Sequence, residues 1–127
     1  MKFLLDTHIL LWWLGNEPKL SPQISAVISN PENTIFVSAA TVWEMSIKKS
    51  LGKLSVPNNL REKLKDNNFT VLDITAEHGL KVTDLPWHHK DPFDKMLVAQ
   101  AMIEGLTIIT VDTKFPLYDV LLLTRVC

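Results

Sequence analysis

Four acidic residues, far apart in the chain, could together do metal-dependent chemistry. Asp6 and Asp112 each follow a short apolar run that is typical of a buried strand, while Glu44 and Asp94 lie in predicted helices among apolar neighbours. Two carboxylates about 4 Å apart repel each other by roughly 4 kcal/mol at an effective dielectric constant near 20. If these four side chains meet, they cannot all stay ionised without a cation or a shared proton.

Such a site would favour Mg²⁺ or Mn²⁺ over zinc, because its ligands are all oxygens. These ions clamp phosphate oxygens and activate water when carboxylates hold them. Each acid also has an ordinary explanation. Asp6 could close a turn, Glu44 could reach solvent or pair with Lys48 four residues on, and Asp91 and Asp94 could complement a helix dipole as first-turn acids. The chemistry therefore depends on whether the four acids converge.

The elements that must position these acids alternate along the chain. The predicted strands occupy residues 2–5, 34–37, 69–74, 106–111 and 120–124. The predicted helices occupy residues 9–14, 21–30, 38–51, 58–67, 76–82 and 91–104. The helices have clear start signals, with Thr7, Ser21, Ser38 and Asp91 as expected caps. This order predicts one α/β domain over residues 1–127 with a mainly parallel sheet.

Parallel strands end at one edge of a sheet, where ligands gather. Asp6 and Asp112 would both lie there, and the helix of Glu44 starts there because it follows a strand. The helix of Asp94 precedes a strand, so spacing does not place it at the same edge.

Composition narrows the class of protein. The chain has 127 residues, 46% of them hydrophobic, and a formal charge of −1, so any attraction to nucleic acid must come from a local patch. Cys127 is the only cysteine, which excludes an internal disulfide and a cysteine-based zinc site. No run approaches the ~20 apolar residues that span a bilayer. We expect a cytoplasmic protein without a cleaved leader or membrane association.

Four motifs together resemble a PIN domain, specifically a VapC-like ribonuclease toxin of a type II toxin–antitoxin pair. They are FLLDTH at 3–8, SAATVWE at 38–44, DPFDKMLVAQA at 91–101 and TVD at 110–112. The third is the most specific, and the resemblance covers essentially the whole chain. The family's acidic pattern falls in order on Asp6, Glu44, Asp94 and Asp112.

The resemblance implies a three-layer α/β/α sandwich with a mainly parallel five-stranded sheet, and a cleft in which the four acids bind one or two Mg²⁺ or Mn²⁺ ions. It implies hydrolysis of RNA by metal-activated water. Asp6 and Asp94 would hold the principal metal with Glu44 nearby, and Asp112 would position a second metal or the attacking water. Thr7 and Thr110 would support the site through hydrogen bonds, and Asp91 would have a structural or secondary role.

Partners follow from the same resemblance: RNA, a cognate antitoxin protein and a second copy of the chain in a homodimer. The early helix, with Trp12, Trp13 and Leu14, would provide part of an antitoxin groove. His8 and His78 are interpreted as structural. Basic side chains beside the acids could contact RNA, although a solvated surface charge is the more common role of such lysines. These residues are Lys48, Lys49, His89 and Lys95, the last in place of a common arginine.

Other classes of protein remain open. A receiver-type signalling module is also α/β and binds Mg²⁺, but it usually has paired acids after the first strand and a lysine near the fifth. A phosphoserine-type hydrolase would need Asp-x-Asp where the chain has Asp6-Thr7-His8. A PIN fold used only for binding is a third alternative, against which the intact acids argue. Acetyl phosphate, a generic phosphatase substrate and an RNA cleavage assay separate these alternatives.

Overall fold

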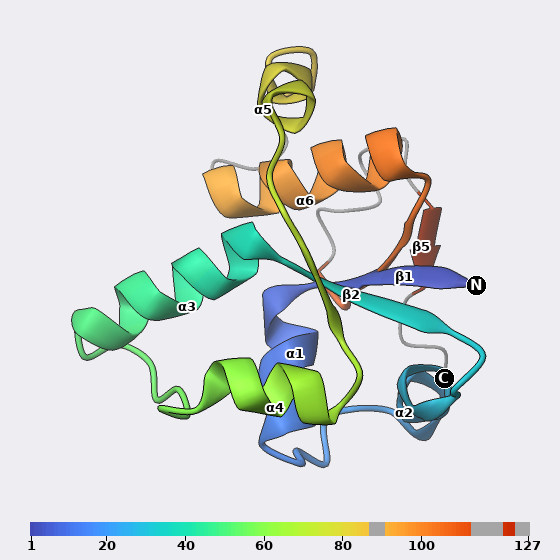
Figure 1. Ribbon diagram of the computed structural model, residues 1–127, viewed down its shortest axis with the longest axis vertical. Helices are drawn as coiled ribbons and strands as arrows, with labels where there is room; N and C mark the ends of the chain where they lie inside the picture. The colour runs from blue at the N-terminus through green and yellow to red at the C-terminus, as the bar shows by residue number, and fades with distance from the viewer. Residues whose placement is uncertain (87–90, 113–120, 124–127) are drawn as a thin grey trace.

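The computed structural model describes residues 1–86, 91–112 and 121–123 of the protein. Strands and helices alternate through most of it, as the sequence predicts (Figure 1). In chain order the elements are β1 (Lys2–Leu5), α1 (Thr7–Leu14), α2 (Pro22–Ser29), β2 (Thr34–Ser38), α3 (Ala39–Ser50), α4 (Leu60–Asp66), β3 (Thr70–Leu72), α5 (Ala76–Val82), α6 (Pro92–Glu104), β4 (Thr107–Ile109) and β5 (Leu121–Leu123).

The sheet has five strands in the order β3-β2-β1-β4-β5, all parallel. Its two faces are covered by different helices, because successive side chains of a strand point to opposite sides. On one face Leu4 and Ile108 pack against apolar residues of α6 such as Leu97. On the other face Phe3 and Leu5 pack against residues of α1 to α4. This is the expected three-layer α/β/α sandwich.

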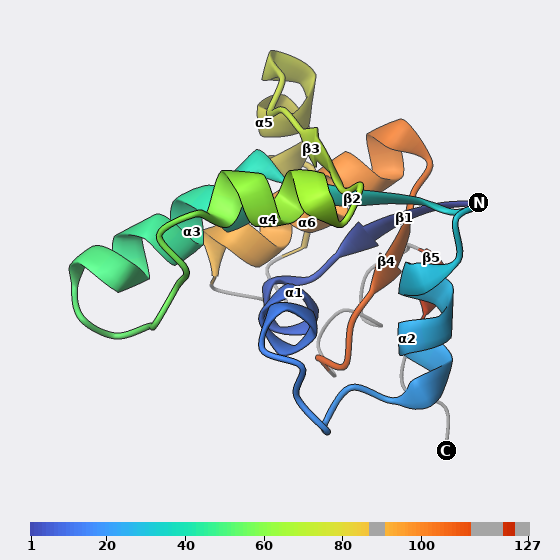
Figure 2. The same cartoon turned by 60° about the horizontal axis from the view of Figure 1, so that its bottom comes forward.

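The topology creates a switch point beside β1. The connections from β1 to β2 and from β2 to β3 run outward through α1 to α4, whereas the connection to β4 returns past β1 through α5 and α6 on the other face. Figures 1 and 2 show α5 and α6 on the opposite side of the sheet from α1 and α2. Ligands of such sheets bind outside the carboxyl ends of the strands where the order reverses, here β1 and β4.

Most predicted caps are confirmed, and one is wrong. Ser21 and Ser38 accept hydrogen bonds from backbone N–H groups two or three residues on, and Asp91 does the same for α6. Helix α1, however, is capped by Asp6, which accepts from the backbone N–H of His8, and Thr7 is already the first helical residue. The side chain of Thr7 does not cap the helix and instead donates a hydrogen bond to Glu44.

Three elements are shorter than predicted, for local reasons. Helix α4 begins at Leu60 rather than at residue 58. Strand β3 begins after Phe69, because the Phe69 N–H bonds the Leu64 carbonyl as α4 closes. Strand β4 begins after Leu106, whose N–H bonds the Ala101 carbonyl. Within the described ranges, no helix combines the length and apolar character needed to cross a membrane.

Candidate active site

Asp6 lies at the carboxyl end of β1 and is held on both carboxylate oxygens. Oδ1 accepts from the His8 backbone N–H at 2.8 Å, and Oδ2 accepts from the Thr110 hydroxyl at 2.5 Å. The side chain is buried, with a residue exposure of 2%. Burial raises the pKa of Asp6, the two hydrogen bonds oppose that effect, and nearby Asp112 adds to it. The sequence expectation of a rigidly held carboxylate at the end of β1 agrees with this geometry.

Glu44 is brought to the same edge by α3, which starts directly after β2. Its Oε1 accepts from the Thr7 hydroxyl at 2.8 Å, and its Oε2 lies 2.6 Å from the Lys48 ammonium. Thr41 adds a third polar group, 3.3 Å from the Thr7 hydroxyl. Glu44 is buried, so it does not reach solvent as the ordinary explanation supposed, but it does pair with Lys48. The hydrogen bond to Glu44 raises the pKa of Lys48.

Asp94 lies close to the other acids, which its spacing in the sequence could not predict. Burial raises the pKa of Asp94 to about 8, and repulsion from Asp91, Asp6, Glu44 and Asp112 adds to this rise. All four carboxylates therefore lie near Asp94. The return of α6 over the sheet, in contact with α3, brings Asp94 to the edge where the other acids gather.

Asp91 and Asp112 make different contacts near Asp6, Glu44 and Asp94. Asp91 caps α6, accepting from the N–H groups of Phe93 at 2.8 Å and Asp94 at 3.4 Å. The Asp112 backbone N–H donates to the Thr110 hydroxyl at 3.0 Å, and that hydroxyl in turn donates to Asp6. Thr110 thus links the two strand-end acids. We refer to Asp6, Glu44, Asp94 and Asp112 as the acidic cluster.

The donor set of the acidic cluster fits a hard divalent cation. It consists of carboxylate oxygens, and two of the four residues, Asp6 and Glu44, are buried. Burial raises the pKa of Asp6 and of Asp94, and repulsion from neighbouring carboxylates adds to both rises. Over the part of the chain that the structure describes, no three acidic, His or Cys side chains are grouped tightly enough to hold a metal as they lie.

The predicted RNA contacts have different outcomes. Lys48 is half-buried and paired with Glu44, and Lys49 is exposed, with its ammonium 2.6 Å from the Asn58 side-chain oxygen. The prediction that Lys95 contacts RNA is corrected, because its side chain is fully buried and offers no surface to a phosphate. Burial also lowers the pKa of Lys95. His89 lies outside the described residues.

The two histidines differ from each other. His78 is structural, as predicted. It is buried in a capping box with Thr75, and its Nε2 lies 2.9 Å from a Glu104 carboxylate oxygen. His8 is not a buried structural residue. Its side chain is 68% exposed, and its Nδ1 lies 3.8 Å from Asp6 Oδ1. Its position directly after Asp6-Thr7 in the opening motif is the signal that could have placed it at the site.

Two hollows lie on the same face of the sheet as α1 and α4. The larger, of about 900 Å³, lies between α3, α4 and β3, and the apolar residues that line it include Val42, Leu60 and Phe69. Its charged lining residues are three basic and one acidic: Lys49, Arg61, Lys65 and Asp73. The smaller, of about 310 Å³, is bordered by Leu11 and Leu14 of α1 and shares residues 56–57 with the larger. Trp12 and Trp13 pack against the core.

Fold and site together define a parallel α/β protein with an acidic cluster at the switch point of its sheet. The sequence matches the family model of the PIN domain over residues 3–121. The chain therefore belongs to the PIN domain family. Membership in this family sets aside the receiver-type and phosphoserine-type alternatives.

Solved structures of low sequence identity share this fold. VapBC2 from Rickettsia felis, bound to a DNA fragment from its promoter, superposes with a TM-score of 0.73 at 18% identity, covering 98% of this chain and 99% of that chain. DNA-bound VapBC from Salmonella typhimurium gives 0.72 at 20% identity, covering 98% of each chain.

A more distant structure is VapBC-5 from Mycobacterium tuberculosis, a member of the VapBC family of toxin–antitoxin systems. It gives a TM-score of 0.58 at 15% identity, covering 97% of this chain and 96% of that chain. No protein with a curated functional description matches the sequence.

Proposed function

We propose that this protein is a metal-dependent endoribonuclease, acting as the toxin of a toxin–antitoxin pair. The observation that carries the proposal is the convergence of four carboxylates on Asp94, whose pKa they help to raise to about 8. In the metal-free protein a proton on Asp94 relieves this repulsion, and a cation would relieve it in the proton's place. A PIN-family cluster of this composition fits Mg²⁺, with Mn²⁺ as a substitute. When bound, the ion supplies charge for the phosphate oxygens and acidifies the attacking water.

The residues of the acidic cluster and the two threonines beside it would have different roles. Asp6 and Asp94 would hold the principal ion, Glu44 would lie beside it, and Asp112 would orient the water or a second ion. Thr110 fixes the Asp6 carboxylate through a hydrogen bond, and Thr7 does the same for Glu44. These hydrogen bonds limit the rotation of the two buried carboxylates, so less entropy is lost when an ion binds.

An RNA cleavage assay with and without a divalent cation tests the proposal. We expect single-stranded or looped RNA to be cut in Mg²⁺ or Mn²⁺, to remain intact in EDTA, and to carry a 5′-phosphate at the new end. A PIN fold used only for binding would retain RNA without cutting it under any metal condition, and that result would refute the nuclease.

Thr110→Val should weaken the nuclease without removing any carboxylate. The fully buried hydroxyl links Asp6 to the Asp112 backbone, and loss of a group that orients a metal ligand typically costs about 10–100-fold in metal affinity or activity. Cleavage rate and Mg²⁺ affinity should both fall in that range. Thr107→Val, three residues earlier on β4, is the matched control and should leave both unchanged. Equal activity of the two variants would contradict the proposed role of Thr110.

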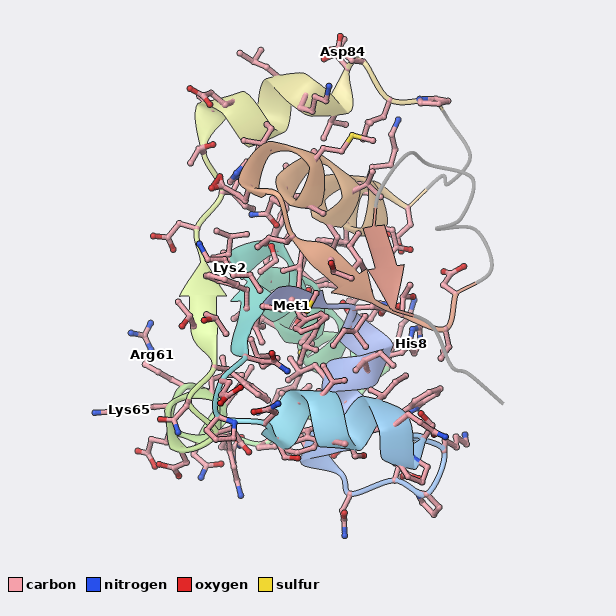
Figure 3. The ribbon with its side chains drawn as sticks, turned by 90° about the vertical axis from the view of Figure 1, so that its right-hand side faces the viewer. Met1, Lys2, His8, Arg61, Lys65 and Asp84 are labelled. Atoms are coloured by element: carbon pink, nitrogen blue, oxygen red, sulfur yellow. The ribbon has the colours of Figure 1, made fainter. Side chains whose placement is uncertain are left out.

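We further propose that the antitoxin inserts an apolar segment with acidic side chains into the larger hollow. The support is the combination of apolar lining residues with three basic side chains, against one acidic side chain, in the lining of this hollow. Figure 3 shows Arg61 and Lys65 projecting outward from α4. The described neighbour VapBC-5 belongs to a family of toxin–antitoxin systems, which favours a protein partner. From the resemblance we also expect two copies of the chain to associate, which light scattering would measure.

The double variant Arg61→Glu/Lys65→Glu should lose the antitoxin. Reversing two charges at the hollow turns attraction into repulsion, and complementary potentials mainly set association rate and specificity. Co-purification with the protein encoded beside this one should fall at least about tenfold, given that like charges across an interface cost several kcal/mol. Lys63→Glu, exposed on the same helix but outside the hollow, should have no such effect. Undiminished binding by the double variant would place the partner elsewhere.

A further inference from the structure

Trp43 is an exposed aromatic residue that directly precedes Glu44 of the acidic cluster on α3. Among the residues that the structure describes, it is the one Trp, Tyr or Phe with a large exposed surface, at 60%. Exposed tryptophan is uncommon, because burying so large a ring is one of the main gains of folding. The fold of the chain does not account for leaving this one in water.

The indole of Trp43 packs against a second ring. Its centroid lies 5.2 Å from that of Phe93, with an interplanar angle of 75°, which is the edge-to-face arrangement that aromatic pairs prefer. Trp43 directly precedes Glu44 on α3, and Phe93 directly precedes Asp94 on α6. The pair therefore joins the two helices that bring these acids together.

The surroundings of Trp43 fit a small planar ligand better than a protein interface. Residues 46 and 50 follow it at helical spacing on the same side of α3; both are exposed serines whose hydroxyls bond backbone carbonyls of their own helix. Two aliphatic side chains also follow the ring along α3, half-buried Ile47 and exposed Leu51 at the C-cap, so its surroundings are mixed. These few apolar side chains on one helix offer far less surface than the roughly 800 Å² that a stable interface buries on each partner around an apolar centre.

We propose that Trp43 is a stacking platform for a nucleobase next to the scissile phosphate, with Phe93 as the positioning residue that fixes its plane. This inference rests on the proposed nuclease function. Every base has a face that stacks on an aromatic ring, and one such contact is typically worth a 5- to 150-fold change in affinity. Phosphates would then pass beside the acidic cluster while the neighbouring base is held on the indole.

Steady-state kinetics on a single-stranded ribo-oligonucleotide that the protein cleaves test this proposal. Trp43→Ala should raise KM at least about fivefold with little change in kcat, whereas Trp43→Phe, which keeps a ring, should retain most of the affinity. Leu80→Ala truncates another exposed apolar side chain, on α5, and should behave like the wild type. An abasic site in place of the base beside the cut should raise the KM of the wild type by the same factor as Trp43→Ala raises it. The same abasic substrate should not raise the KM of Trp43→Ala any further.

Two results would overturn the stacking proposal alone: a wild-type KM for Trp43→Ala while the wild type cleaves RNA, or a loss of activity that comes with a change in molecular mass by light scattering. The second result would assign Trp43 to an interface between chains. If the wild type cleaves no RNA in any divalent cation, the proposed function fails, and the stacking role fails with it.

Discussion

Asp6→Asn should abolish RNA cleavage and leave the protein folded. Loss of a group that only orients a metal ligand costs up to about 100-fold, so loss of a ligand at the centre of the cluster should cost more. The amide has nearly the same shape and can still accept a hydrogen bond from Thr110 or from the His8 N–H. Cleavage rates from protein prepared without any wild-type copy are the measurement.

The fold of the Asp6→Asn variant should be at least as stable as the wild type. Burial raises the pKa of Asp6, which means that the folded protein disfavours its charge, and the substitution removes that charge. Asp73→Asn is the matched control, since Asp73 also follows a parallel strand, β3, but is exposed and is not among the acids that raise the pKa of Asp94. Asp73→Asn should cleave at the wild-type rate. Full cleavage by Asp6→Asn would refute the metal assignment.

The metal-free protein should lose stability as pH rises from about 4 to about 8. The pKa of Asp94 is about 8 in the folded chain, against an ordinary 3.8, so between these values the folded state holds a proton that the unfolded state releases. That contribution is complete below the lower value and is lost as pH rises through the upper one. Its slope is at most about 1.4 kcal/mol per pH unit, and partial exposure of the side chain reduces it.

Asp94→Asn isolates this effect. In EDTA, urea unfolding at both ends of the pH range should show the variant more stable than the wild type at the alkaline end and similar at the acid end. Excess Mg²⁺ should reverse the order at the alkaline end, because the ion binds the ionised wild-type carboxylate and raises its stability by mass action. A wild type whose pH dependence matches that of Asp94→Asn would contradict the raised pKa.

The features that the sequence predicts best are those that depend on contacts between residues close together in the chain. The caps by Ser21, Ser38 and Asp91 depend on hydrogen bonds within three residues, and each was predictable from residue type and spacing. Residue type alone does not decide the cap of α1, because Asp6 and Thr7 are both good caps and the structure uses Asp6 where the sequence suggests Thr7. Tertiary structure decided between them: Thr7 is directed at Glu44, which lies 37 residues away along the chain.

Helix α6 shows why the remaining predictions were limited. It contacts α3, α5 and β4, and it buries side chains around most of its circumference, so its sequence has no polar stripe to mark a solvent face. Lys95 consequently looked like a surface charge although it is buried. For the same reason, the place of Asp94 depended on how the whole helix returns over the sheet, which spacing does not encode.

The hydrogen bond between Thr110 and Asp6 joins residues 104 positions apart, and it has a consequence for synthesis of the protein. Central strand β1 leaves the ribosome before the other strands of the sheet, and its neighbour β4 follows about a hundred residues later. A nascent chain or a prematurely terminated product that lacks β4 cannot assemble the acidic cluster, however well its first half folds. If the proposed function holds, no cutting activity can precede the synthesis of residue 110, so copies that end before it would be harmless to the cell that makes them.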